Sequence, residues 1–244
     1  MEPIYVQNFQ INDAAVDRYG RLKPSMILFY AQEIAGKHCD LLSLDYDSLA
    51  QRRMFWAVTR HRVQVTRMPM RGETIRVETW PMPTTKVAFP RSVVAYDEKG
   101  QEVFRAISVW VLMNLDTRAM ILPSRSGVQV DGTLLGSELA IPGALVPKPM
   151  SHSMDRVVRY TDLDRNGHMN NTRYFDWMDD LLPSEFHEAH PFREFTICYH
   201  TEALEGDTLN LQWDILGGDT MQVDATRKNP DGSESRVFSA RTLL

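Results

Sequence analysis

The feature that most constrains the fold of this chain is an internal repeat of its motifs. Three landmarks occur twice in the same order. They are a glycine in an Asp-x-x-Gly turn, a glycine before a strand and a glycine in a short turn, at Gly20, Gly72 and Gly100 and again at Gly167, Gly206 and Gly232. The matching glycines are separated by 147, 134 and 132 residues. Such a repeat predicts two copies of one supersecondary unit.

Each copy combines one helical pattern with several strand patterns. Apolar residues alternate in HRVQVTR (61–67), ETIRVETW (73–80) and EFTICYH (194–200), which predicts strands. Apolar residues with helical spacing occur once in each copy. In the first copy they follow Pro24, at Ile27, Tyr30, Ala31 and Ile34. In the second copy they precede Pro183, at Tyr174, Trp177, Met178 and Leu181. We therefore expect an α+β fold in which each half is an antiparallel sheet wrapped around one long helix.

The repeat also predicts the domain organisation. Residues 1–120 form the first copy and residues 150–244 the second. The intervening segment 121–149 is rich in Gly, Pro and Ser, which is typical of a linker on the surface. One copy alone would leave a sheet edge uncovered, and two copies can pair their edges.

Composition excludes several classes of protein. The chain has 244 residues, 43% hydrophobic and 24% charged, as in an ordinary globular protein. Its N-terminus lacks the pattern of a secretory signal and no apolar run is long enough to span a membrane, so we expect a cytoplasmic location. The only cysteines, Cys39 and Cys198, exclude a disulfide framework and a multi-cysteine zinc site.

The charge distribution argues against general nucleic-acid binding, since the formal net charge is −5. Short basic clusters still leave room for an acidic partner, although the plainer interpretation is that they solvate the outer faces of strands. These clusters are Arg52 and Arg53; Arg60, His61 and Arg62; and Arg67 and Arg71.

The segment DLDRNGHMNNTRYFDW (162–177) admits two interpretations. Its first residues match an EF-hand calcium loop, but the twelfth position, which must be a bidentate carboxylate, is Arg173. The alternative is a tight turn before a helix, with Asn170 or Asn171 as the N-cap. A turn alone explains Asp164 and Gly167 and leaves Asn166 and His168 unexplained.

Comparing the two copies identifies the candidate site. The first copy keeps the Asp and the Gly of the turn, but it has Tyr19 in place of Asn166 and Arg21 in place of His168. Aligning Gly72 with Gly206 also sets Met68 opposite Glu202. The second copy therefore carries polar residues where the first does not. A histidine near a carboxylate can activate water, and the amides of a helix N-terminus can stabilise an oxyanion, so acyl transfer to water is the expected chemistry.

These residues resemble those of a known family. The segment 162–177, followed 34 residues after His168 by Glu202 in YHTEA, is similar to the active-site signature of the acyl-acyl-carrier-protein thioesterases. Residues 55–81 and 106–123 resemble the N-terminal blocks of that family, so the similarity runs from about Tyr5 to Leu244.

The resemblance implies a double hotdog fold and a place in fatty acid biosynthesis. It implies catalytic roles for Asp164, Asn166, His168 and Glu202, with the fatty chain held largely in the N-terminal hotdog. Plant members commonly have a cysteine after the glutamate, and here that residue is Ala203, which excludes an acyl-cysteine there. We expect direct attack by water, activated by Glu202 and His168, without a metal or another cofactor.

The implied reaction is hydrolysis of fatty acyl thioesters on acyl carrier protein, an acidic partner that presents a helical face. An acyl-CoA thioesterase of the same fold and a non-catalytic acyl-binding protein are the alternatives. Cys198 is expected to be a buried small hydrophobe, and His187 and His190 to be surface residues rather than a metal pair. The sequence leaves room for a homodimer.

Overall fold

The computed structural model describes residues 3–217 and 219–243 and divides the chain into two compact units, Met1–Pro142 and Gly143–Leu244. The division falls inside the segment 121–149 that the composition marks as a linker. The expected boundaries of the two hotdogs therefore stay a prediction.

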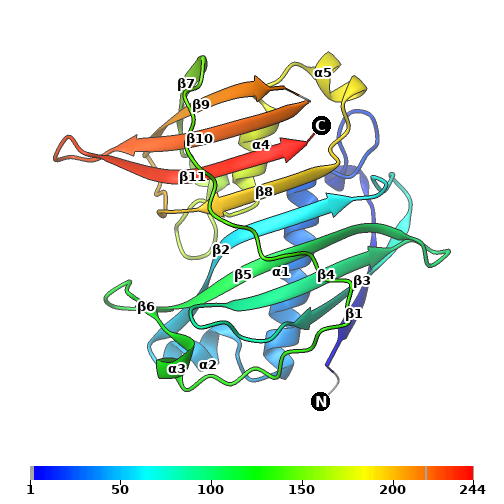
Figure 1. Ribbon diagram of the computed structural model, residues 1–244, viewed down its shortest axis with the longest axis vertical. Coiled ribbons are helices and arrows are strands. Elements are labelled where there is room, and N and C mark those ends of the chain that lie inside the picture. The colour runs from blue at the N-terminus through cyan, green and yellow to red at the C-terminus, as the bar shows by residue number, and fades with distance from the viewer. Residues whose placement is uncertain (1–2, 218, 244) are drawn as a thin grey trace. The chain divides into compact units, whose positions relative to one another are not determined.

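The first unit is an antiparallel sheet with one long helix (Figure 1). The strand order is β1-β3-β4-β5-β2, and the short β6 pairs with β5. The bounds of its elements are β1 Tyr5–Gln10, η1 Asp13–Ala15, α1 Pro24–Leu41, α2 Tyr46–Gln51, β2 Met54–Val65, β3 Thr74–Pro81, β4 Phe89–Tyr96, β5 Glu102–Asn114, β6 Met120–Ile121 and α3 Pro123–Ser126.

Helix α1 begins as the sequence predicts and packs on the sheet. Pro24 occupies its first turn, where the missing amide hydrogen costs nothing. Ile27 and Ile34 are fully buried, and α1 contacts β1 and β3. Each buried aliphatic side chain of this kind stabilises the fold by about 1.5–3 kcal/mol. The predicted helical face is therefore confirmed as part of the core of this unit.

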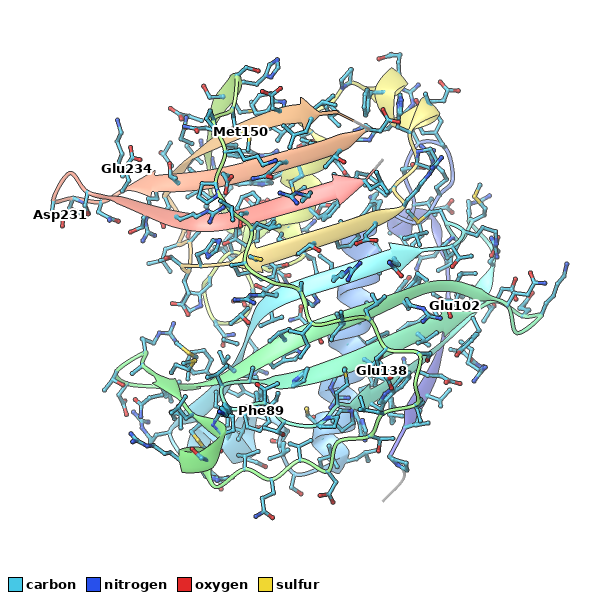
Figure 2. All side chains as sticks on the ribbon, viewed as in Figure 1. Phe89, Glu102, Glu138, Met150, Asp231 and Glu234 are labelled. Atoms are coloured by element: carbon cyan, nitrogen blue, oxygen red, sulfur yellow. The ribbon has the colours of Figure 1, made fainter. Side chains whose placement is uncertain are left out.

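The second unit repeats this topology. Its strand order is β7-β9-β10-β11-β8, which has the same pattern of connections as the first sheet. Figure 2 labels Asp231 and Glu234 in its β10–β11 hairpin. The bounds of its elements are β7 His152–Val157, η2 Tyr160–Asp162, α4 Arg173–Asp179, α5 Ser184–Ala189, β8 Glu194–Tyr199, β9 Thr208–Leu216, β10 Thr220–Lys228 and β11 Glu234–Leu243.

The helix of the second unit is shorter than the long helix that the sequence predicts. Helix α4 has 7 residues and α1 has 18. Its apolar residues still form the core, because Tyr174 packs on Phe238 and Phe175 on Phe195, with ring centroids 4.8 and 4.4 Å apart. Two aromatic pairs of this kind give a short helix a large buried area.

Backbone geometry confirms that the two units are copies of one structure. The three glycine pairs that define the repeat all have positive φ, at 76° and 78°, at 87° and 88°, and at 75° and 83°. Only glycine adopts this conformation freely. The isolated bridge between Arg21 and Met70 in the first unit also recurs between His168 and Leu204 in the second. The register that sets Met68 opposite Glu202 is therefore present in the backbone.

The segment after α3 runs without helix or strand along the first sheet (Figure 2, where Glu138 is labelled). The amide of Thr133 donates to the carbonyl of Pro81 at 2.9 Å, and the indole of Trp80 donates to the Glu138 carboxylate at 3.2 Å. Arg60 donates to the carbonyl of Pro142 at 2.9 Å. This part of the expected linker is therefore fixed to the first unit by hydrogen bonds.

Candidate active site

The Asp164 turn is organised by hydrogen bonds to its own backbone. The Asp164 carboxylate accepts from the amides of Asn166 at 2.8 Å and His168 at 3.3 Å. The amide of Asp164 donates to the carbonyl of His168 at 2.8 Å. A carboxylate that accepts backbone amides in this way fixes a turn. Asp164 thereby determines where Asn166 and His168 lie.

The structure brings His168 and Glu202 together. Nε2 of His168 lies 3.5 Å from a carboxylate oxygen of Glu202, and the two side chains are 17% and 45% exposed. The His168 imidazole is thus largely covered, whereas Glu202 is open to solvent. An imidazole beside a carboxylate is an arrangement that can accept a proton from water and pass it on.

Main-chain contacts hold these two segments together. The amide of Met169 donates to the carbonyl of Ala203 at 2.8 Å, next to the bridge between His168 and Leu204. Met169 and Ala203 are buried. The side chain following Glu202 is therefore packed inside the unit, as well as lacking the thiol of a nucleophile.

Asn166 is placed differently from His168 and Glu202. Its amide is held by Asp164, and the residue is exposed at the surface of the turn. An exposed carboxamide is available to hydrogen-bond a ligand, with no change in charge. Of the four residues predicted from the sequence, the structure thus brings His168 and Glu202 into direct side-chain contact and joins Asn166 and Asp164 through the backbone.

One local prediction was wrong. The N-cap of α4 is Thr172 rather than Asn170 or Asn171, although the Asn170 side chain accepts from the Thr172 amide at 3.0 Å. Strand β8 ends at Tyr199, so Glu202 lies in the loop that follows it. The expectation that Cys198 is buried is confirmed.

Tyr174 was not identified as a site residue from the sequence. It lies on α4 and is 3% exposed. Burial raises the pKa of its hydroxyl above the usual value, and the negative charge of Glu202 raises it further. The only sign of Tyr174 in the sequence was its place on the apolar face of a helix, which does not distinguish a core tyrosine from one near a site.

The matching position in the first unit contains no such pair. There the Asp17 carboxylate accepts from the amides of Tyr19 and Arg21 at 2.8 and 2.9 Å, which reproduces the turn. The Arg21 side chain then forms an ion pair with Asp17 at 3.0 Å and lies over the Tyr19 ring, 4.7 Å from its centroid. The same backbone turn therefore carries an ion pair between Arg21 and Asp17 in the first unit and an imidazole beside a carboxylate in the second.

The described residues contain no cluster of three or more His, Cys, Asp or Glu side chains that could hold a metal ion. His187 and His190 are half-buried rather than exposed, and their ring nitrogens lie 2.8 and 2.9 Å from the carbonyls of Asp179 and Phe186. They serve the local structure around α5. Within the same described residues, no helix is long and apolar enough to cross a membrane.

Solved structures with the same fold confirm the predicted double hotdog. An acyl-ACP thioesterase from Bacteroides thetaiotaomicron superposes with a TM-score of 0.86 at 24% identity, covering 99% of this chain and 97% of that one. A 12:0-ACP thioesterase from Umbellularia californica gives a TM-score of 0.82 at 22% identity, with the same coverage of 99% and 97%.

Curated plant proteins are among the relatives of this chain. The chloroplastic palmitoyl-acyl carrier protein thioesterase of Gossypium hirsutum is 28% identical over 214 residues, which are 82% of this chain and 52% of that protein. Its counterpart in Arabidopsis thaliana is 26% identical over 231 residues, 88% of this chain and 56% of that protein. This chain therefore spans about half the length of the curated relatives that it matches.

Family patterns match both halves in chain order. The pattern described as the acyl-ACP thioesterase N-terminal domain matches residues 2–122, and that of the C-terminal domain matches residues 147–236. Because the two matches cover both copies of the repeat, this chain belongs to the acyl-ACP thioesterase family.

Proposed function

We propose that this chain hydrolyses fatty acyl thioesters of acyl carrier protein to free fatty acid and the carrier. The observation that carries the proposal is the 3.5 Å contact between His168 Nε2 and the Glu202 carboxylate. Family membership supports the reaction, as does the likeness to the plant relatives, which are named as acyl carrier protein thioesterases.

The chemistry uses water as the nucleophile. The Glu202–His168 pair removes a proton from water as its oxygen adds to the thioester carbonyl carbon. The C–S bond then breaks, and the proton passes to the departing thiolate sulfur. Asp164 fixes the turn, and the exposed Asn166 carboxamide orients the reacting groups.

Stabilisation of the oxyanion needs a different source from the first amides of α4. The amide of Thr172 donates to the Asn170 side chain, and that of Arg173 donates to the Asn170 carbonyl at 2.9 Å. Both donors are thus used within the turn that precedes the helix. We therefore do not assign the oxyanion to these two groups, although the sequence led us to expect helix amides to hold it.

Replacing either member of the pair tests the assignment. In Glu202→Ala and in His168→Ala, we expect kcat to fall about 10²- to 10⁴-fold, the usual effect of losing a general base. Release of thiol from an acyl thioester, followed colorimetrically, gives the rate. Glu205→Ala is the matched control, because Glu205 is an exposed acid in the same loop. Near-wild-type rates in correctly folded Glu202→Ala and His168→Ala would contradict the proposal.

The carrier is tested separately, by comparing one acyl chain on acyl carrier protein and on CoA. The basic clusters noted in the sequence do not by themselves identify a docking face. Arg53 pairs with Asp116, Arg67 with Glu73, and Arg71 with Asp13. An acidic carrier would have to compete with these ion pairs. A higher kcat/KM on the protein carrier would support acyl carrier protein as the substrate.

Three further parts of the proposal rest on the sequence and on the family. They are binding of the acyl chain by the first unit, a role in fatty acid biosynthesis in the cytoplasm, and a homodimer. Binding of the acyl chain by the first unit is supported by Met68, which is the first-unit equivalent of Glu202, since an apolar side chain suits a fatty chain. Cell fractionation and light scattering test the location and the oligomeric state.

A further inference from the structure

Arg227 on β10 contacts the loop that carries Glu202. Its Nη1 donates to the Glu202 carbonyl at 3.2 Å, and the same nitrogen forms an ion pair with Asp207. The side chains of Arg227 and Asp207 are only 20% and 23% exposed. A partly buried guanidinium that binds both a carboxylate and a carbonyl holds both in a fixed geometry.

Asp207 extends this contact to the rest of the loop. Its carboxylate accepts from the Leu204 amide at 2.8 Å, and its own amide donates to the Leu204 carbonyl at 3.1 Å. Leu204 in turn forms the bridge with His168. Arg227 and Asp207 therefore fix the backbone from the Glu202 carbonyl to Leu204, as well as the strand contact that places His168. We call this pair the Glu202 clamp.

The first unit has a matching clamp in its own loop. Arg67 donates to the Met68 carbonyl at 3.5 Å and to the Glu73 carboxylate at 2.8 and 2.9 Å. Alignment of Gly72 with Gly206 makes Met68 equivalent to Glu202 and Glu73 equivalent to Asp207. Both loops are thus held by a guanidinium on the same carbonyl and by an acid at the same position.

The arginine comes from a different place in each unit. Arg67 lies in the loop itself, and the equivalent residue in the second unit is Thr201. Arg227 instead reaches the loop from β10, and it is less exposed than Arg67, at 20% against 43%. The guanidinium of the second unit is therefore more shielded from water. Ionic contacts are stronger where water is excluded.

Arg227 also acts on the electrostatics of the site. Its positive charge opposes the rise in the pKa of Tyr174 that burial and the charges of Glu202 and Asp164 produce. Arg227 is therefore within electrostatic range of the same tyrosine as the proposed catalytic carboxylate.

We infer that Arg227 and Asp207 are positioning residues that hold the Glu202 carboxylate toward His168. The inference rests on the proposed function, in which Glu202 and His168 activate water. Neither residue needs to touch the substrate. Displacing a catalytic group by about 1 Å can lower a rate about 10²-fold.

The kinetic test uses Arg227→Gln and Asp207→Asn, each with its match in the first unit, Arg67→Gln and Glu73→Gln. For the second-unit variants we expect kcat on an acyl thioester to fall about 10- to 100-fold, with KM changed less than about threefold. The first-unit variants should keep kcat within about twofold. Arg227→Lys should recover part of the rate, because it keeps the charge opposite Asp207.

Two results would overturn the inference. One is an unchanged kcat in Arg227→Gln and Asp207→Asn, and the other is an equal loss in the first-unit variants, which would indicate a general effect on folding. The double variant Arg227→Gln/Asp207→Asn should be no slower than the slower single variant, since the two residues act as one unit. Additive losses of kcat would show that the two residues act independently, which would contradict the clamp.

Hydrogen exchange keeps the inference testable if the wild-type chain hydrolyses no acyl thioester, which would refute the proposed function. Amides of Leu204 and Met169 should exchange faster in Asp207→Ala than in wild type, because alanine lacks the oxygen that accepts from the Leu204 amide, and Glu73→Ala should leave them unchanged. Unchanged exchange in Asp207→Ala would refute the clamp independently of activity.

Discussion

One backbone turn carries two different side-chain arrangements in this protein. Arg21 closes onto Asp17, while His168 in the equivalent position faces Glu202. Comparing the two copies in the sequence singles out Asn166, His168 and Glu202 as candidates, because the differences fall at positions that otherwise match between the copies. Arg227 could not be found in this way, since it reaches the site from a distant strand and belongs to no motif.

Asp164 is expected to act mainly through the turn. Asp164→Asn keeps an oxygen that can accept the amides of Asn166 and His168, so kcat should stay within about tenfold of wild type. Asp164→Ala removes both hydrogen bonds, each worth about 1 kcal/mol, and should lower kcat further. Steady-state kinetics on one acyl thioester compare the two. Asp17→Ala removes the same turn contacts in the first unit and should leave kcat unchanged.

If Asp164→Asn were as slow as Asp164→Ala, the charge of Asp164 would be required. The role of this residue would then be chemical rather than structural.

His61 on β2 is predicted to make stability depend on pH. It is 1% exposed, and burial lowers its pKa to about 3, against about 6.5 in an unfolded chain. Between these values the unfolded state binds more protons, so stability rises with pH and is lost as the pH falls. The contribution is about 1.4 kcal/mol per pH unit, or about 2 kcal/mol between pH 6.5 and pH 5.

Urea unfolding at pH 7 and pH 5 measures this effect. The loss of stability at pH 5 should be smaller by that amount in His61→Gln than in wild type. His152→Gln is the control, because the side chain of His152 is 59% exposed. An equal pH dependence in wild type and His61→Gln would show that His61 does not cause it.

At the level of elements, periodicity predicted the main strands and both helical segments, and the structure contains them. Their ends were harder to predict. Pro24 marks the start of α1 because proline suits a first turn. In the second unit, three asparagine or threonine residues, Asn170, Asn171 and Thr172, precede α4, and residue preferences alone do not choose among them. Strand β8 also ends at Tyr199, before Glu202.

The segment after α3 offers an element-scale prediction. A Cβ on Gly132 would overlap the backbone of Met82 and Pro83, where the segment crosses the end of β3. Backbone cannot move aside as a flexible side chain can, so Gly132→Ala should lower the free energy of unfolding by about 1–3 kcal/mol. Gly143→Ala in the following part of the segment meets no atom within 4 Å and is the matched control. Urea unfolding compares them, and equal stabilities would contradict the close approach.

For the whole molecule, the repeat predicted the architecture because two copies in one chain leave matching landmarks at nearly constant spacing. Three glycine pairs with the same sign of φ and two sheets with the same strand order confirm it. The carrier and the length of the fatty chain leave no comparable trace. They depend on the shape and charge of surfaces, which single residues in a sequence do not report.

The net charge of the chain makes the salt dependence of the reaction informative. At −5, the whole molecule repels an acidic carrier, so salt would speed the reaction if net charge decided the encounter. If a local basic face receives the carrier, salt screens that attraction and kcat/KM falls.

We expect kcat/KM to fall with salt, by about tenfold between about 0.05 and 0.5 M salt, which initial rates on acyl carrier protein would measure. The same acyl chain on neutral N-acetylcysteamine should show little change. A rise with salt on the protein carrier would indicate that the chain has no face that attracts it, and would favour a small carrier as the substrate.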